Sequence, residues 1–264
     1  MFTLMELVQP QSLEEAYEIH TKRKNNIVIG GSAFLRMGKK RIGTGIDLSA
    51  LNLNIIEESS DYIEIGAMSK LRDIEVSPIL NKYFDGVLPK AVRDIIGVQF
   101  RNVVTVGGSV FSRYGFSDLI VGLLALQTEV ELYNGGRILL EEFLNKKYEK
   151  DILVKLYIKK NNANAIYKCM RNSRSDYPIL NVAVSKANDN LKICVGARPQ
   201  RATIAVKASE FLSENELNEE NIMKASEIAA EELVFGSNMR ASKEYRKAIC
   251  KSLVKNALME VSSC

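Results

Sequence analysis

The most constraining feature of this 264-residue sequence is its uneven distribution of glycine. Fourteen of the sixteen glycines lie at or before Gly136, and only Gly196 and Gly236 follow. Glycine marks turns with positive φ and places where the backbone approaches another group closely. The sequence therefore predicts two kinds of architecture, and its length suffices for one large domain or two smaller ones.

Composition excludes several kinds of site. His20 is the only histidine, so a multi-histidine metal site is excluded and a Ser-His-Asp triad would have to use His20 itself. The cysteines form no C-x-x-C pair, which argues against a zinc ribbon or a cysteine-ligated iron–sulfur cluster. We therefore predict no metal site and expect four structural thiols, at Cys169, Cys194, Cys250 and Cys264.

The sequence carries no signal for export or for a membrane. Glu6, Glu14 and Glu15 lie where a signal peptide would have basic residues followed by an apolar core. The longest apolar run, residues 119–126, is far shorter than the ~20 residues that span a bilayer. The net charge of +4 is small and interspersed, which argues against nucleic acid. We expect a soluble, cytoplasmic protein.

The first part of the chain is predicted to alternate short strands with helices. Ser12 and Glu15 form a capping box that starts a helix, and Ser69 is expected to cap another. A turn at Asn134-Gly135-Gly136 indicates a hairpin. We expect strands at 27–29, 46–48, 62–65, 130–133, 137–140 and 152–158, and helices at 13–20, 69–74, 78–83, 88–95 and 118–126.

From about residue 165 the pattern changes to consecutive strands. These are expected at 166–170, 179–185 and 191–196, and the last two are joined by the turn Asn188-Asp189-Asn190. Two long helices follow, at about 219–233 and 242–261. A three-stranded sheet covered by a helical layer would form a second domain.

Two predicted strand-to-loop junctions carry a glycine pair followed by serine, Gly30-Gly31-Ser32 and Gly107-Gly108-Ser109. Glycine lets backbone N–H groups approach an anion without an intervening Cβ atom. A diphosphate between two such loops would be bound by backbone donors and by the hydroxyls of Ser32, Thr105 and Ser109. Neither junction matches a P-loop or a G-x-G-x-x-G fingerprint, and each is also consistent with a simple tight turn.

Several motifs in order resemble one protein family. IVIGGSAFLRM (27–37), VQFRNVVTVGGS (98–109), SDLIVGLLALQTEVEL (117–132) and KCMRNSRSDYPILNVAV (168–184) are examples, and the likeness runs nearly from end to end. The sequence resembles the FAD-binding medium subunit of the molybdenum hydroxylases, such as xanthine dehydrogenase and carbon monoxide dehydrogenase. The resemblance implies an α+β (mixed α/β) fold. A two-subdomain PCMH-type FAD-binding domain would occupy residues 1–160, divided into 1–55 and 56–160. A C-terminal domain with a three-stranded antiparallel sheet and helices would occupy 165–264.

The resemblance also implies partners and a cofactor. A large molybdopterin subunit would oxidise the substrate, and a small subunit with two [2Fe–2S] clusters would relay electrons. This chain would pass them through FAD, held between its two N-terminal subdomains, to an acceptor such as NAD. Because the cofactor carries the chemistry, no catalytic side chain is predicted. The residues implied in FAD binding are Ile29, Gly30, Gly31, Ser32, Ala33, Phe34, Thr105, Gly107, Gly108, Ser109, Ser112, Asp118 and Lys168.

Some positions depart from the family pattern or have competing interpretations. The family more often has GGTDL where this chain has Gly-Gly-Ser-Ala33-Phe, and GGN where it has Ser109, and its 112–116 loop is bulkier. These changes leave open a flavin-poor scaffolding subunit, and a free-standing flavin reductase is a further alternative. Asp118 also fits the first turn of a helix capped by Ser117. Lys168 is either next to the flavin or else solvated or paired elsewhere. Tyr114 and Phe116, in that loop, would shield the flavin, dock a nicotinamide or simply pack.

Overall fold

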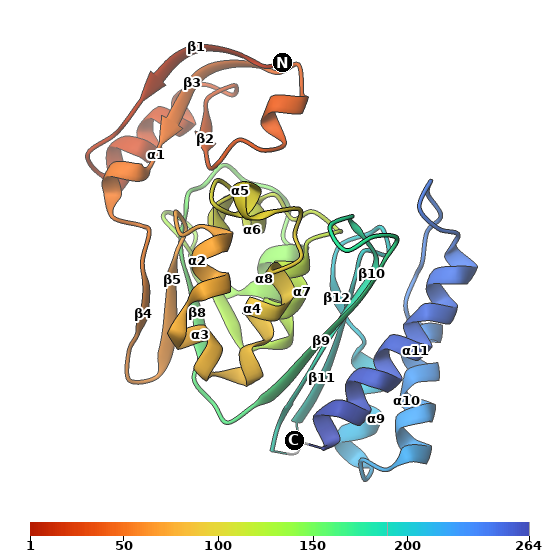
Figure 1. Ribbon diagram of the computed structural model, residues 1–264. Helices are drawn as coiled ribbons and strands as arrows, with labels where there is room; N and C mark the ends of the chain where they lie inside the picture. The colour runs from red at the N-terminus through yellow and green to blue at the C-terminus, as the bar shows by residue number, and fades with distance from the viewer. Residues whose placement is uncertain (189, 264) are drawn as a thin grey trace. The chain divides into compact units, whose positions relative to one another are not determined.

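The computed structural model describes residues 1–188 and 190–263 (Figure 1). The chain forms two compact units, each assembled from three separate segments. Unit 1 contains residues 1–74, 97–112 and 128–158, and unit 2 contains 75–96, 113–127 and 159–264. The mixed α/β fold class is therefore confirmed, while the division into contiguous domains near residue 160 stays a prediction.

Unit 1 begins with a three-stranded parallel sheet. Its strands β1 (Thr3–Val8), β2 (Ile27–Ile29) and β3 (Arg41–Asp47) lie in the order β1-β3-β2, and helix α1 (Leu13–Lys22) packs against β3. The sequence analysis missed β1, an edge strand with a mostly exposed pattern. The core under α1 draws on distant segments and contains Ala16, Ile46, Leu48, Leu53, Met68, Ile152 and Val154.

Side chains at both ends fix helix α1. Ser12 accepts the N–H of Glu15, as the capping box predicts, while the Glu15 carboxylate accepts the N–H of Gln11. At the other end, the Lys150 ammonium donates to the carbonyl oxygens of His20 and Arg23, at 2.6 Å each, and to that of Asn26 at 3.1 Å. Carbonyls at a helix C-terminus lack partners within the helix, so a cation stabilises this end.

The rest of unit 1 is built on a five-stranded sheet. Its strands are β4 (Ile56–Glu58), β5 (Tyr62–Gly66), β8 (Leu153–Lys159), β6 (Thr128–Leu132) and β7 (Gly136–Leu139), in that order. Helices α5 (Val98–Arg101), α6 (Val106–Phe111) and α8 (Leu140–Asn145) accompany it. Ser69 does not cap helix α2 (Leu71–Val76), because its hydroxyl donates to the carbonyl of Ile55, and the Asp73 carboxylate instead accepts the N–H of Lys70.

Unit 2 is centred on an antiparallel sheet in the order β12-β11-β10-β9. The three long strands β9 (Asn164–Arg171), β10 (Pro178–Ala187) and β11 (Asn190–Gly196) confirm the predicted sheet, and the two-residue β12 (Thr203–Ile204) extends it. The predicted turn after Asn188 includes Asp189, which lies outside the described residues, as does Cys264.

Helices cover both faces of this sheet within unit 2. Helices α9 (Val206–Glu214), α10 (Glu219–Glu232) and α11 (Lys243–Ser262) form one layer, and α9 was not predicted (Figure 1). Helices α4 (Val87–Val92) and α7 (Asp118–Ala125) form the other. Side chains of strand β10 alternate between the two helical layers. Val182 and Val184 belong to the core under α9–α11, whereas Asn181 and Ser185 form hydrogen bonds to α7.

Candidate functional site

The first glycine pair lies where strand β2 ends. Gly31 and Ser32 have φ angles of +67° and +53°, in the left-handed region that glycine tolerates best. A Cβ atom on Gly31 would lie 2.9 Å from the carbonyl carbon of Val103 and closer still to its oxygen. Gly31 is therefore required both by its backbone angles and by a close neighbour.

The loop after β2 holds backbone donors without an acceptor. Among the described residues, no group accepts the N–H of Gly31, Ser32 or Ala33, and the Ser32 hydroxyl has no partner either. All three residues are half-buried. The loop is closed by the N–H of Arg36, which donates to the carbonyl of Ser32 at 3.1 Å. Successive N–H groups in a loop that contains left-handed residues form a concave site for an anion.

The second glycine pair has a different structure from the one predicted. Gly107 and Gly108 lie in the first turn of helix α6, not in a strand-to-loop junction. Thr105 caps this helix, and its hydroxyl oxygen accepts the N–H of Gly108 at 3.1 Å. The N–H groups of Val106, Gly107 and Ser109 donate to the carbonyls of Ser69, Ala67 and Thr105. The backbone donors of this segment are thus already used within the protein.

The two glycine pairs meet within unit 1. A Cβ atom on Gly30 would lie 2.5 Å from the Thr105 hydroxyl oxygen, and one on Gly108 would lie 3.1 Å from the carbonyl oxygen of Gly30. A Cβ atom on Gly107 would lie 2.7 Å from that of Ala67. Gly30 and Gly108 therefore allow the first loop to pack against α6, and Gly107 allows α6 to pack against Ala67. The sequence predicted the juxtaposition but not this division of roles.

Ser109 of helix α6 and Ser112, its C-cap, also donate hydrogen bonds to backbone carbonyls of their own segment. The hydroxyl of Ser109 donates to the carbonyl of Thr105 at 2.9 Å, and that of Ser112 donates to the carbonyl of Gly108 at 2.6 Å. Of the predicted residues, Ile29, Gly30, Gly31, Ser32, Ala33, Phe34, Thr105, Gly107, Gly108, Ser109 and Ser112 all belong to unit 1.

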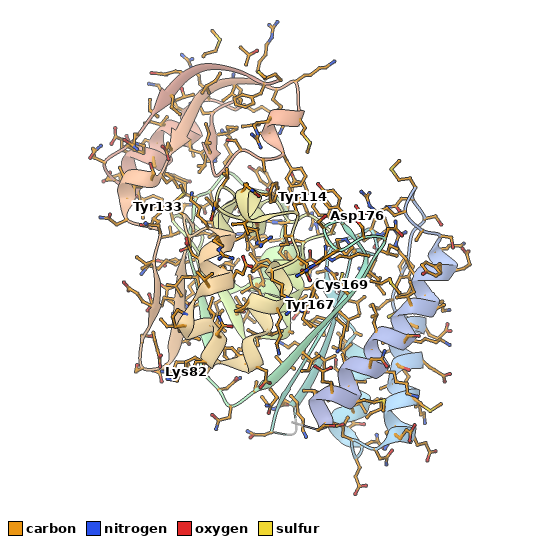
Figure 2. All side chains as sticks on the ribbon, in the orientation of Figure 1. Lys82, Tyr114, Tyr133, Tyr167, Cys169 and Asp176 are labelled. Atoms are coloured by element: carbon orange, nitrogen blue, oxygen red, sulfur yellow. The ribbon has the colours of Figure 1, made fainter. Side chains whose placement is uncertain are left out.

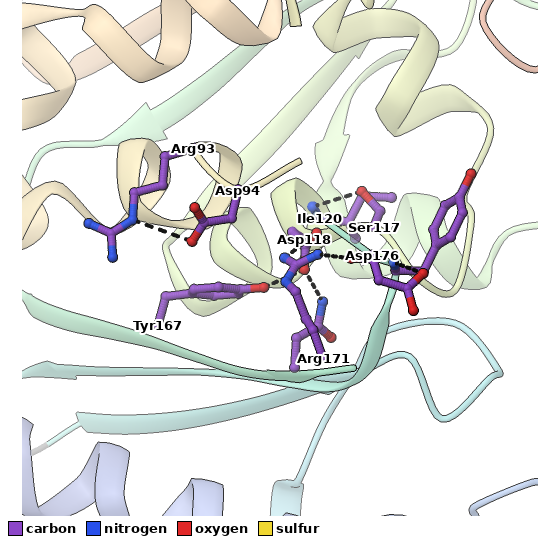
Figure 3. A network of polar contacts seen from close by, with 10 residues as sticks. Arg93, Asp94, Ser117, Asp118, Ile120, Tyr167, Arg171 and Asp176 are labelled. Atoms are coloured by element: carbon purple, nitrogen blue, oxygen red, sulfur yellow. Dashed lines mark hydrogen bonds and ion pairs between the residues drawn. The ribbon is translucent and has the colours of Figure 1, made fainter. Parts of the chain in front are cut away.

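The other two predicted residues, Asp118 and Lys168, belong to unit 2. Asp118 is buried at the start of α7, where Ser117 is the N-cap, so the capping interpretation of this position is confirmed. Its carboxylate accepts hydrogen bonds from Tyr167 and from Asn181, the latter at 2.8 Å, and pairs with Arg171 at 2.8 Å (Figure 3). Figure 2 labels Tyr167 and Cys169 on strand β9.

Burial raises the pKa values of three groups around Asp118. It raises the pKa of the Asp118 carboxyl, which the guanidinium of Arg171 opposes. Burial likewise raises the pKa of Tyr167 well above its usual range and that of the Cys169 thiol to about 12, with the Asp118 charge adding to both shifts. Cys169 is therefore a neutral thiol at physiological pH and not a nucleophile.

Lys168 lies on the opposite face of strand β9 from this cluster. Side chains alternate along a strand, so Tyr167, Cys169 and Arg171 share the face toward α7. Lys168 instead forms an ion pair with Glu260 on α11. The structure therefore shows Lys168 paired, and its role beside the flavin stays a prediction. Sequence reasoning missed Tyr167, Arg171 and Asn181 as partners of Asp118, although the alternation along 167–171 was a readable signal.

An aromatic cluster in unit 2 includes two residues of the bulky 112–116 loop. The Tyr114 and Phe116 rings stack at 5.0 Å between centroids, and Phe116 meets Tyr177 edge to face at 4.8 Å. The Arg240 guanidinium lies 4.9 Å from the centre of the Tyr177 ring and 3.4 Å from the Asp176 carboxylate. Tyr114 is 37 % exposed, so one ring of the stack is accessible.

Two kinds of feature are not found in the described part of the chain. Residues 1–188 and 190–263 contain no group of three or more His, Cys, Asp or Glu side chains placed to hold a metal ion. No helix within the same residues has the length and apolar character needed to cross a membrane.

Two family models together cover nearly all of the chain. Residues 2–159 match the FAD binding domain in molybdopterin dehydrogenase, and residues 165–261 match the CO dehydrogenase flavoprotein C-terminal domain.

Individual proteins are similar over nearly their whole length. The chain is 27% identical to the nicotine 6-hydroxylase medium subunit of Paenarthrobacter nicotinovorans, covering 96% of each. It is 24% identical to the glyceraldehyde dehydrogenase medium chain of Sulfolobus acidocaldarius, covering 97% of each. A structure of carbon monoxide dehydrogenase from Hydrogenophaga pseudoflava aligns with a TM-score of 0.90 at 21% identity, over 98% of this chain and 97% of that one. The fold is thus that of these enzymes. The chain belongs to the FAD-binding medium subunits of the molybdenum hydroxylases, and it is an FAD-dependent oxidoreductase subunit.

Proposed function

We propose that this chain is the electron-transferring subunit of a molybdopterin-dependent hydroxylase or dehydrogenase. A large molybdopterin subunit would supply electrons to the [2Fe–2S] clusters of a small partner subunit. This chain would receive the electrons from those clusters and pass them to an acceptor such as NAD. The names of two relatives, a medium subunit and a medium chain, support a role within an assembly of several chains.

The observation that carries the proposal is the set of free donors at Gly31, Ser32 and Ala33. They lie in the part of the chain that matches the FAD-binding family model. Three half-buried N–H groups and one hydroxyl fit a doubly charged diphosphate, because each unpaired donor gains a charge-assisted hydrogen bond. The residues present therefore fit FAD, and residues 29–34 are its proposed binding loop.

The two glycine pairs would have different roles in FAD binding. The first loop would donate hydrogen bonds to the diphosphate. Helix α6, with Thr105 and Gly108, would hold that loop in the binding conformation by close packing. Bound FAD supplies the chemistry, since it accepts and releases electrons. The chain needs no acid–base side chain for this role, and burial, with the charge of Lys150 adding to it, lowers the pKa of its one histidine to about 4.

The acceptor proposal has a separate basis in unit 2. A stacked aromatic pair with one exposed ring, Tyr114 over Phe116, offers a flat surface for a planar ring such as nicotinamide. Ser117, the next residue along the chain after Phe116, caps helix α7 and so fixes the end of that loop.

Reconstitution with FAD tests the proposed function. We expect the purified chain to take up FAD in a one-to-one ratio with visible flavin absorbance, and to co-purify with two further subunits from its native host. A native assembly with three subunits but no flavin would point to the scaffolding alternative. Full turnover of a substrate by the isolated, FAD-loaded chain would point to a free-standing flavin reductase.

A further inference from the structure

Seven basic side chains are concentrated in a segment that has no acidic residue. Residues 19–46 contain no Asp or Glu. The whole chain carries only +4, so the remaining residues together are acidic by three charges. All seven basic residues are exposed: Lys22, Arg23, Lys24, Arg36, Lys39, Lys40 and Arg41.

Strand pairing brings the two basic runs, residues 22–24 and 39–41, to the same end of the parallel sheet. Thr3 of β1 is the register partner of Arg41, and the N–H of Thr3 donates to the carbonyl of Lys40 at 3.0 Å. On the other side of β3, the N–H of Gly43 donates to the carbonyl of Asn25 at 3.2 Å. Residues 22–24 and 39–41 are therefore neighbours at the end of the sheet where all three strands begin. We call these six residues the basic edge, and Arg36 is the seventh basic residue of the segment.

The basic edge is not neutralised by the chain itself. Within residues 1–188 and 190–263, no carboxylate lies within 4.0 Å of any of these seven cations. Glu6, on the neighbouring strand, accepts a hydrogen bond from the Thr44 hydroxyl at 3.0 Å. The lysines of helix α11 behave differently, because Lys247 lies 2.6 Å from Glu231 and Lys251 lies 4.0 Å from Glu227.

Exposed apolar side chains follow the basic edge along strand β1, where Thr3 pairs with Arg41 and Leu7, four residues further on, pairs with Gly45. Met5 and Leu7 of strand β1 are 78 % and 60 % exposed, and Met37 is 70 % exposed. Strand β1 is also an edge strand, since it pairs only with β3 in this sheet. Exposed apolar residues with a charged rim have the composition of a protein–protein interface, and a free strand edge adds backbone groups for pairing.

We propose that the basic edge and strand β1 form a docking surface for an acidic protein, a further chain of the assembly. Charge complementarity selects an acidic partner and disfavours a second copy of this chain, whose basic edge would repel the first. Residues 1–46 include no exposed aromatic side chain, so the surface lacks the stacking platform of a single-strand nucleic-acid site. Burial in lipid would leave the free backbone groups of the β1 edge without partners.

Cross-linking of the native assembly tests this proposal, which rests on the proposed function only in requiring that an assembly exists. A zero-length carbodiimide reagent joins lysine amines to carboxylates. We expect Lys22, Lys24, Lys39 and Lys40 to be joined to Asp or Glu residues of a second chain, identified by mass spectrometry. The internal pair Lys247–Glu231 serves as the positive control. If subunits co-purify but these four lysines stay free to react with an amine reagent, the docking surface is wrong while the proposed function stands.

Two variants of the full chain test the charged and apolar parts separately. Lys39→Glu with Lys40→Glu, and Leu7→Asn alone, are each expected to weaken binding of the cross-linked partner at least tenfold, and only the first effect should shrink at high salt. Lys243→Glu with Lys247→Glu makes the same charge change on α11 and is expected to leave binding unchanged. An unaffected Leu7→Asn variant would contradict docking at this surface. Tighter binding to anionic phosphatidylglycerol vesicles than to the partner would also overturn the proposal.

Discussion

The two glycine pairs look alike in sequence and differ in structure. Gly30-Gly31 lies in an irregular loop with positive φ and three unpaired N–H groups nearby. Gly107-Gly108 lies in a short helix whose N–H groups are all bonded. Both pairs therefore remove side chains so that two segments can touch, and the first pair differs because unpaired backbone donors lie beside it.

The largest expected effect comes from Gly31→Ala. The new Cβ atom would overlap the carbonyl of Val103 and would sit at a φ of +67°. We expect the dissociation constant for FAD, measured by flavin fluorescence, to rise about 100-fold, equivalent to ~3 kcal/mol.

Gly136→Ala is the matched control, because Gly136 also has positive φ, +66°, but no atom within 4 Å of a new Cβ. That variant should lose about 1 kcal/mol of unfolding free energy and keep its FAD affinity. Equal FAD affinities for the two variants would contradict the role of the first loop.

Gly107→Ala tests the second pair. A Cβ atom would lie 2.7 Å from the Cβ atom of Ala67, so α6 must shift, at a cost of about 1–3 kcal/mol in unfolding free energy. Urea denaturation of the FAD-free chain measures this loss. A variant with normal stability that fails to bind FAD would show that α6 contacts the cofactor directly, and so would remove the distinction between the pairs.

A fall in pH should lower the unfolding free energy of the protein through protonation of His20, which lies in the helix before the first loop. Burial, and then the charge of Lys150, lower the pKa of His20 to about 4. The folded protein therefore resists protonation of a group that titrates near pH 6.5 when unfolded. Stability is lost as the pH falls from about 6.5 to 4, by ~2–3 kcal/mol. Urea denaturation of the wild type and of His20→Gln at pH 7 and pH 4.5 checks this, and the variant should show the smaller loss. Identical losses would exclude His20 as the cause.

Ser112→Ala should have the smallest effect. The Ser112 hydroxyl donates to a carbonyl of its own helix, and such bonds contribute little, below about 0.5 kcal/mol. FAD affinity, measured by fluorescence titration, should change by less than twofold. A loss of tenfold or more would mean that this hydroxyl turns to the cofactor, as the family resemblance implies.

The sequence was sufficient where the signal is local. Capping at Ser12 and Ser117, the hairpin around Gly136, and the strands at 166–196 follow from periodicity and turn chemistry, and the structure contains them. Strand β1 was missed because an edge strand with exposed Met5 and Leu7 lacks the alternation of a half-buried strand. Ser69 was misassigned because its hydroxyl bonds to Ile55, fourteen residues away.

Sequence alone determined the family, the fold class and the positions of the two glycine pairs, because these depend on ordered motifs and local backbone preferences. Tertiary structure decided which pair keeps free donors, that Asp118 is held by Tyr167, Arg171 and Asn181, and that Lys168 faces Glu260. The physical reason is that hydrogen-bond satisfaction and strand parity join residues far apart in the chain. A glycine is the same residue in a loop and in a helix, and only its neighbours in space decide which N–H groups remain available.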